Sequence, residues 1–231
     1  MGIINERVKR LHKAARGISE LRWNDEEARQ SWKLPEERVI KTAEAFMRFW
    51  AGQRRPRLID IGCGAGRHAL ALGASGFEAC ACDANSESVR NAGFAMASAG
   101  IEGRVAKAFM SSLPWPDGHF DFALAWNAFY HGSRQDLERA LGEAWRVMAP
   151  GAWLEATFLS ARNSCFGKGL SIDPWTWIGE NGDDKGYPHC YLDRREMDSV
   201  LRGFAVDELE EYEQPGYEGA WHWHLVARKE P

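Results

Sequence analysis

Residues 58–66 read Leu-Ile-Asp-Ile-Gly-Cys-Gly-Ala-Gly, and this stretch decides the fold. A short apolar run comes first, three alternating glycines follow, and residues 67–72 have helical character. Glycine lets the backbone turn tightly and lets a ligand approach it without interference from a Cβ atom. The unpaired N–H groups at the start of a helix can then bind that ligand. The stretch predicts a strand, a glycine turn and a helix that together cradle a nucleotide-type cofactor.

A second apolar run, residues 77–82, ends in Asp83, seventeen residues after Gly66. An acidic side chain at the tip of the second strand is placed to accept hydrogen bonds from ribose hydroxyls. The dinucleotide fingerprint G-x-G-x-x-G would need its third glycine at position 67, where the chain has Arg67. The G-x-G-x-G spacing therefore disfavours an NAD-dependent oxidoreductase, which remains an alternative. A purely structural turn would leave Asp83 unexplained.

Composition limits the class of protein. A chain of 231 residues fits a single domain with a sizeable core. The net charge of −4 argues against nonspecific nucleic-acid binding. No apolar stretch is long enough to cross a bilayer, and the start has no signal-peptide pattern. Five cysteines, an odd number, indicate a reducing compartment. We expect a cytoplasmic protein without membrane or nucleic-acid partners; the sequence leaves the oligomeric state open.

Strands and helices alternate after the first strand. Expected strands lie near residues 57–62, 77–82, 103–108, 120–126 and 151–159. Expected helices lie near residues 35–50, 66–74, 86–98, 134–147 and 193–201, and a hairpin joins residues 205–212 to 221–228. Such alternation is typical of an α/β, doubly wound, mostly parallel sheet.

Two segments have no place in that sheet. Residues 1–34 contain an amphipathic helix, and residues 161–192 are rich in glycine and aromatic residues but have no clear period. A loop of that length is usually functional or disordered, and the aromatic content argues against disorder. Within one domain spanning residues 1–231, we expect a helical lid at residues 1–34 and an insert over the active site at 161–192. Plain structural packing is the alternative for both.

The chain resembles the class I S-adenosylmethionine-dependent methyltransferases. Asp60–Gly66 with Asp83 looks like motif I and the second-strand acid of that family. Residues 113–121, LPWPDGHFD, and 147–152, VMAPGA, resemble the family segments LPFPDGSFD and VLKPGG. The resemblance runs from about residue 35 to residue 229. It implies a Rossmann-like seven-stranded sheet with a C-terminal antiparallel hairpin strand, and methylation of a small molecule. The tail at residues 221–229 is similar to a bacterial branch near the tellurite-resistance methyltransferases.

The resemblance also implies where S-adenosylmethionine would bind. Asp60 would steer the methionine ammonium group or order the glycine loop, and Asp83 would hold the ribose. Phe109 stands where the family often has an acid that binds the adenine amino group, so stacking on Phe109 is expected instead. The predicted cofactor-binding residues are Asp60, Gly62, Cys63, Gly64, Gly66, Asp83, Ala84, Phe109, Met110, Trp126 and Asn127.

The acceptor side has a weaker pattern. His131, which titrates near neutral pH, is a candidate general base next to Tyr130. Trp175, Trp177 and His189 are candidate substrate-binding residues from the insert, although all five residues also fit purely structural roles. His222 and His224 share one strand face, but no third ligand of evident spacing accompanies them, and no metal is predicted. A cofactor-binding regulatory protein without turnover remains the non-enzyme alternative.

Overall fold

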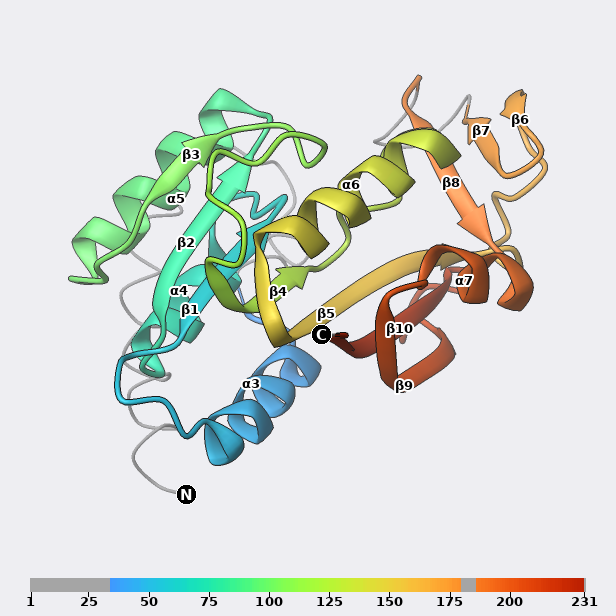
Figure 1. Ribbon diagram of the computed structural model, residues 1–231. Coiled ribbons are helices and arrows are strands. Elements are labelled where there is room, and N and C mark those ends of the chain that lie inside the picture. Colours follow the sequence, from blue (N-terminus) through green and yellow to red (C-terminus); the bar gives the residue numbers. More distant parts are fainter. Residues whose placement is uncertain (1–33, 180–185, 231) are drawn as a thin grey trace.

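The computed structural model describes residues 34–179 and 186–230 as a twisted sheet with helices on both faces (Figure 1). Seven of its strands run in the order β3-β2-β1-β4-β5-β10-β9. Their bounds are β1 Arg57–Ile61, β2 Glu78–Asp83, β3 Val105–Lys107, β4 Phe120–Ala125, β5 Met148–Ser160, β9 Phe204–Glu213 and β10 Trp221–Lys229. Strands β1 to β5 pair in parallel, and β10 pairs antiparallel with both β5 and β9. The predicted α/β sheet with its C-terminal hairpin is confirmed.

The helices form two groups, and each group packs with one face of the sheet around its own apolar core. The helices are α3 Glu37–Phe49, α4 Arg67–Ala74, α5 Ser86–Ser98, α6 Arg134–Val147 and α7 Arg194–Val200. Buried side chains of α3, α4 and α5 pack on one face of the sheet. Buried side chains of α6 and α7 pack on the other face. Because the carboxyl ends of the parallel strands all lie on the same side of the molecule, the residues that follow β1, β2 and β4 lie near one another. Open α/β sheets bind ligands at these carboxyl ends.

Local capping explains where two of the helices begin. The side chain of Ser133 accepts a hydrogen bond from the backbone N–H of Asp136, and the side chain of Asp136 accepts one from the N–H of Ser133, which is the predicted capping box. Asp193 caps α7 by accepting the N–H of Glu196. Both capping predictions are confirmed, and the caps fix where α6 and α7 begin.

The insert is more regular than its sequence indicated. Among the described residues of the segment 161–192, three strands form, β6 Leu170–Asp173, β7 Thr176–Ile178 and β8 Pro188–Leu192. They pair antiparallel with one another, and β8 also pairs in parallel with the last two residues of β5. The expectation of a segment without regular structure was wrong. The strands are short and β6 is exposed, so the chain shows no alternation of apolar and polar residues that would reveal them.

The predicted N-terminal lid, residues 1–34, falls almost wholly outside the described residues. Within the described part of the chain, no helix is both long and apolar enough to cross a membrane.

Candidate functional site

The glycine turn after β1 has the backbone geometry that its sequence predicted. Gly62, Gly64 and Gly66 have φ values of 71°, 54° and 84°, in the left-handed region that glycine adopts readily. The N–H groups of Gly62 and Cys63 both donate to the carbonyl oxygen of Cys82, at 2.8 and 2.9 Å. The turn is therefore tied to the end of β2, beside Asp83.

The three glycines are required for different reasons. A Cβ atom on Gly62 would lie 2.6 Å from Cβ of Ala128, and one on Gly66 would lie 2.8 Å from Cβ of Ala92. A Cβ atom on Gly64 would meet no described atom within 4 Å. Gly62 and Gly66 therefore serve close packing, whereas Gly64 borders open space where a ligand can approach the backbone.

Asp83 stands at the end of β2 with its carboxylate held by the neighbouring backbone. One oxygen accepts the N–H of Gly64 at 2.9 Å, and the other accepts the N–H of Asn85 at 2.8 Å. The side chain is half-buried, and each carboxylate oxygen retains a second lone pair for a ligand hydroxyl. Asp83 thus links the glycine turn to the predicted ribose position.

Substitution of Asp83 by alanine is expected to weaken binding of S-adenosylhomocysteine by about 1–3 kcal/mol, or roughly 5- to 150-fold, because hydrogen bonds to a charged group are lost. Isothermal titration calorimetry measures the change. Glu78→Ala, at the other end of β2, is the matched control and should bind with wild-type affinity. Equal affinities for both variants would remove Asp83 from the cofactor site.

Asp60 is buried beneath the turn, with only 1% of its surface exposed. Its Oδ2 atom accepts the N–H of Ala69 at 3.1 Å, in the first turn of α4. Burial raises the pKa of Asp60 to about 7, while the Ala69 hydrogen bond and the charge of Arg67 act in the opposite direction. Asp60 therefore holds the first turn of α4, next to the glycine turn; ordering of the glycine loop and steering of a methionine ammonium group both stay predictions.

Arg67 occupies the position of the third glycine of the dinucleotide fingerprint and contacts the start of α3. Its guanidinium donates to the carbonyl oxygen of Leu34 at 2.9 Å and to the carboxylate of Glu36 at 3.2 Å. The next residue, His68, accepts the N–H of Glu36 at 3.2 Å. Positions 67 and 68 thus fasten α4 to the start of α3, a role that the spacing of the glycines did not reveal.

The other predicted cofactor residues differ in how accessible they are. Trp126 is buried between the rings of His68 and His224, at centroid distances of 6.2 and 5.7 Å. Asn127 has a φ of 53°. Its backbone N–H donates to the hydroxyl of Thr157, and that hydroxyl donates to the side-chain oxygen of Asn127. Ala84 and Phe109 are exposed, Phe109 with 68% of its surface, and Met110 packs against the core. An exposed Phe109 fits the predicted stacking role, which stays a prediction.

The structure brings Tyr130, His131 and His189 together at the end of β4. The His131 ring lies 4.6 Å from the Tyr130 ring and 4.9 Å from the His189 ring, between centroids. Backbone pairing supports the arrangement, since Cys190 donates to the carbonyl oxygen of Tyr130 at 2.9 Å. The insert is therefore hydrogen bonded to the loop that carries the two predicted catalytic residues.

The two tryptophans of the insert occupy different positions. Trp177 packs against Tyr130, Leu159 and Tyr191. Its indole Nε1 is buried and has no hydrogen-bond partner among the described residues. Trp175 stacks on Phe166, with ring centroids 5.9 Å apart, and packs against the α6 side of the core. Trp177 therefore lies beside Tyr130, and Trp175 supports the insert.

Sequence reasoning missed His222 as a member of this region. His222 is buried opposite Leu159, at the carboxyl end of β5, and its ring lies 6.1 Å from the Tyr130 ring. Its Nδ1 donates to the carbonyl oxygen of Ala220 at 3.1 Å, which leaves the lone pair on Nε2. Burial lowers the pKa of His222, so the ring is neutral at neutral pH. Only the register of β10 against β5 places it here, and no local pattern encodes that register.

A cavity lined by Phe46, Trp50 and Trp153 lies near the start of β5, whereas the glycine turn lies at the carboxyl ends of the parallel strands. It is separate from the candidate site.

Comparison with known proteins defines the class of this fold and turn. Residues 58–151 match the family described as a methyltransferase domain. Residues 58–151 therefore form a methyltransferase domain, in agreement with the class I S-adenosylmethionine-dependent family that the motifs predicted. The suggested proximity to the tellurite-resistance branch stays a prediction.

Two curated relatives are similar over part of the chain. An uncharacterized methyltransferase, YcgJ, of Bacillus subtilis is 35% identical over 111 residues, which cover 48% of this chain and 40% of the relative. The demethylmenaquinone methyltransferase of Thermus thermophilus is 37% identical over 100 residues, 42% of this chain and 44% of the relative. The chain spans less than half of the length of either relative.

A solved structure is similar over the whole chain. The 1,6-didemethyltoxoflavin-N1-methyltransferase of Burkholderia thailandensis, with bound 1,6-didemethyltoxoflavin and S-adenosylhomocysteine, superposes with a TM-score of 0.65 at 17% identity. The match covers 100% of this chain and 92% of that one. At this identity the likeness establishes a shared fold.

Proposed function

We propose that this protein transfers a methyl group from S-adenosylmethionine to a small-molecule acceptor. The observation that carries the proposal is the open space beside Gly64, bordered by the fixed carboxylate of Asp83, within a methyltransferase domain. When bound, S-adenosylmethionine supplies a methyl group on a sulfonium sulfur. Asp83 would hold the ribose hydroxyls, and the backbone of the glycine turn would lie against the methionine part.

The reaction requires alignment more than acid–base chemistry. A lone pair on the acceptor forms the bond to the methyl carbon, and the electron pair of the carbon–sulfur bond returns to sulfur. Holding donor and acceptor in line supplies up to about 7–11 kcal/mol of the barrier. Where the acceptor carries a proton, Nε2 of His222 or the ring of His131 would take it, because both rings lie beside Tyr130.

We infer that residues 161–192 form the acceptor wall, with Trp177 and His189 facing Tyr130 and His131. The hydrogen bonds between β8 and the loop after β4 support this assignment. The names of one relative and of one structural neighbour suggest the chemical class, since demethylmenaquinone and 1,6-didemethyltoxoflavin both contain a flat ring system. Aromatic side chains suit such acceptors.

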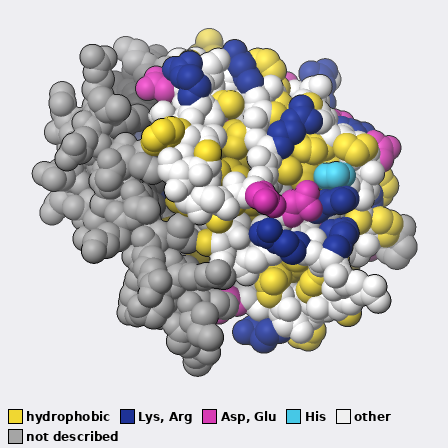
Figure 2. Space-filling model, turned by 90° about the vertical axis from the view of Figure 1, so that its left-hand side faces the viewer, with side chains coloured by type: hydrophobic (Ala, Val, Ile, Leu, Met, Phe, Trp, Pro, Cys, Tyr) yellow, Lys and Arg dark blue, Asp and Glu magenta, His cyan; other side chains and the backbone are white. Residues whose placement is uncertain are grey.

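Other observations support a small molecule rather than a nucleic acid as the partner. On the face in Figure 2, Lys and Arg side chains are interspersed with Asp and Glu side chains, and the net charge is −4. All five cysteines are free thiols, which supports the proposed cytoplasmic location.

Titration calorimetry tests the cofactor assignment. S-adenosylhomocysteine is expected to bind with a 1:1 stoichiometry, and NAD is expected to give no measurable heat, because position 67 holds an arginine turned toward α3. Tight NAD binding without S-adenosylhomocysteine binding would contradict the proposal. If S-adenosylmethionine binds but no methyl group reaches a panel of phenolic and nitrogen-heterocyclic acceptors, the non-catalytic alternative is favoured.

Trp177→Phe tests the acceptor wall, because it removes the indole N–H and keeps an aromatic ring. The variant is expected to raise KM for the acceptor identified in the panel roughly 5- to 30-fold, the effect of about 1–2 kcal/mol from one hydrogen bond, with unchanged affinity for S-adenosylhomocysteine. Trp175→Phe, which preserves the stack on Phe166, is the control. Wild-type kinetics in both variants would confine the acceptor site to Tyr130, His131 and His222.

A further inference from the structure

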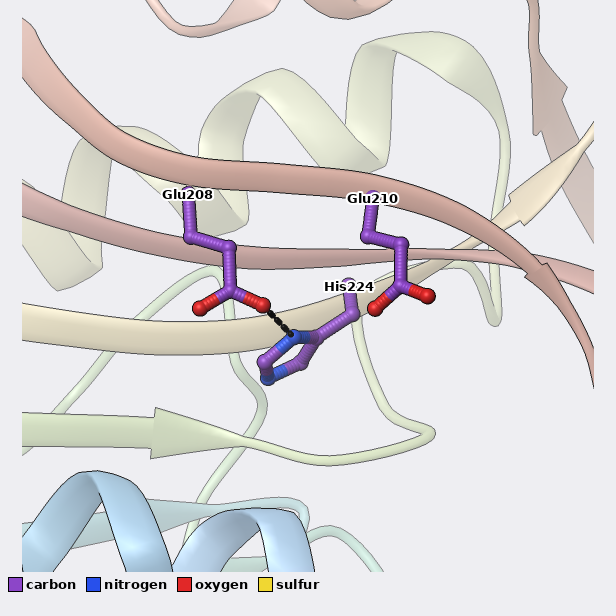
Figure 3. Close-up of side chains that lie close together, drawn as sticks. All are labelled: Glu208, Glu210 and His224. Atoms are coloured by element: carbon purple, nitrogen blue, oxygen red, sulfur yellow. Dashed lines mark ion pairs between the residues drawn. The ribbon is translucent and has the colours of Figure 1, made fainter.

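Two glutamates and a histidine converge on the hairpin, away from the glycine turn. Glu208 and Glu210 lie on one face of β9, and the backbone register places His224 of β10 directly opposite Glu210. One ligand atom from each of the three side chains lies within 4.8 Å of the others. Figure 3 shows both carboxylates directed toward the imidazole of His224.

The protonation of His224 follows from its partner on β5. Nε2 of His224 lies 2.9 Å from Oε1 of Glu155, which also accepts the hydroxyl of Thr42 at 3.1 Å. A carboxylate oxygen accepts, so Nε2 carries the hydrogen and the lone pair of a neutral ring is on Nδ1. Among the described residues Nδ1 has no hydrogen-bond partner, although the side chain is only 3% exposed.

A carboxylate lies beside that lone pair. Oε1 of Glu208 is 3.4 Å from Nδ1, so in the neutral ring two electron-rich atoms face each other. Two ligands about 2.1 Å from a tetrahedral metal ion are themselves about 3.4 Å apart, as zinc coordination requires. The separation therefore matches two ligands of one cation and exceeds an ordinary N–H···O distance.

The carboxylates around His224 also favour a bound cation. In the described part of the chain, the carboxylates of Glu155, Glu208 and Glu210 lie around His224, and the guanidinium of Arg38 on α3 pairs with Glu210. The Trp126 ring, 5.7 Å from His224, contributes no formal charge.

We propose that Nδ1 of His224 and the carboxylates of Glu208 and Glu210 bind one divalent first-row transition-metal cation, with water completing its coordination. Glu155 orients the ligand, because a metal-binding histidine usually donates its other N–H to a carboxylate. An imidazole with two carboxylates suits Zn²⁺ or Mn²⁺. The sequence predicted no metal because it paired His224 with His222, whereas His222 binds the Ala220 carbonyl and stacks on Tyr212. The cation site is separate from the proposed methyl transfer.

Untagged protein stripped with EDTA and titrated with Zn²⁺ and with Mn²⁺ tests the proposal. One equivalent of at least one of the two ions is expected to bind and to raise the Tm, since a ligand that binds the native state stabilises it. Glu208→Gln and Glu210→Gln are each expected to weaken binding at least tenfold. Both carboxylates are about half exposed, so these variants should fold.

Glu211→Gln is the matched control, because Glu211 lies on the same strand but on its opposite face, against Ser160. It should bind the cation as the wild type does. The proposal is overturned if wild-type protein binds neither ion, or if binding survives unchanged in Glu208→Gln and Glu210→Gln, as it would if cysteine thiols were the ligands.

Discussion

Gly64→Val is expected to lower the affinity for S-adenosylhomocysteine at least about a hundredfold, or roughly 2.7 kcal/mol. The open space beside Gly64 is where the cofactor is proposed to lie, and a branched side chain would fill it. The φ of 54° adds strain of about 1–2 kcal/mol for a residue with a Cβ atom. Calorimetry measures the affinity, and circular dichroism should show an unchanged content of helix and sheet.

Gly100→Val separates the two contributions to that result. Gly100 has a φ of 66°, and a Cβ atom there would also meet no described atom within 4 Å, but the residue lies just beyond α5, away from the glycine turn. Both variants should lose similar stability in urea unfolding, and only Gly64→Val should lose affinity. Equal affinities in the two variants would show that the turn is purely structural.

Asp60→Asn is expected to change how stability depends on pH. Asp60 has a pKa of about 7 in the folded protein against an ordinary value of 3.8, so between these values the folded state holds a proton that the unfolded state has released. Stability contributed by this group therefore falls as pH rises through that window and is constant above it. At 1.36 kcal/mol per unit, wild type should lose roughly 2–3 kcal/mol relative to the variant between about pH 5 and pH 8.

Urea unfolding of both proteins across that range measures the difference. Asp198→Asn, on the exposed surface of α7, is the control and should run parallel to wild type. A constant difference between wild type and Asp60→Asn would mean that Asp60 is ionised throughout, and would favour a fixed positive charge beside it.

The parts that could be predicted from sequence are those that adjacent residues determine. The spacing of Gly62, Gly64 and Gly66 specifies a turn, because positive φ values are readily available only to glycine. The alternation of strands and helices specifies a parallel sheet, and Ser133 with Asp136 specifies a helix start. Each of these depends on contacts within one short segment of chain.

The parts that could not be predicted depend on pairing between distant segments. His222 reaches Tyr130 only because β10 pairs with β5 in one register, and His224 meets Glu210 only through the register of β9. The insert strands are stabilised by β5 and by the loop after β4, so their own residues carry no periodic signal. In the sequence, Arg67 was notable only because a dinucleotide fingerprint has a glycine at that position. Its contacts with Leu34 and Glu36 form only when α3 and α4 pack together.

The backbone bridge between His131 and His189 has an evolutionary consequence. The residues proposed for the donor come mainly from residues 60–84, with further candidates at 109–110 and 126–127, and those proposed for the acceptor wall come mostly from residues 130–191. Gly132 donates to the carbonyl oxygen of Pro188, so the insert is anchored through main-chain atoms that any replacement side chain retains. Mutations in the insert can therefore diversify the accepted molecule while the glycine turn stays under its own selection.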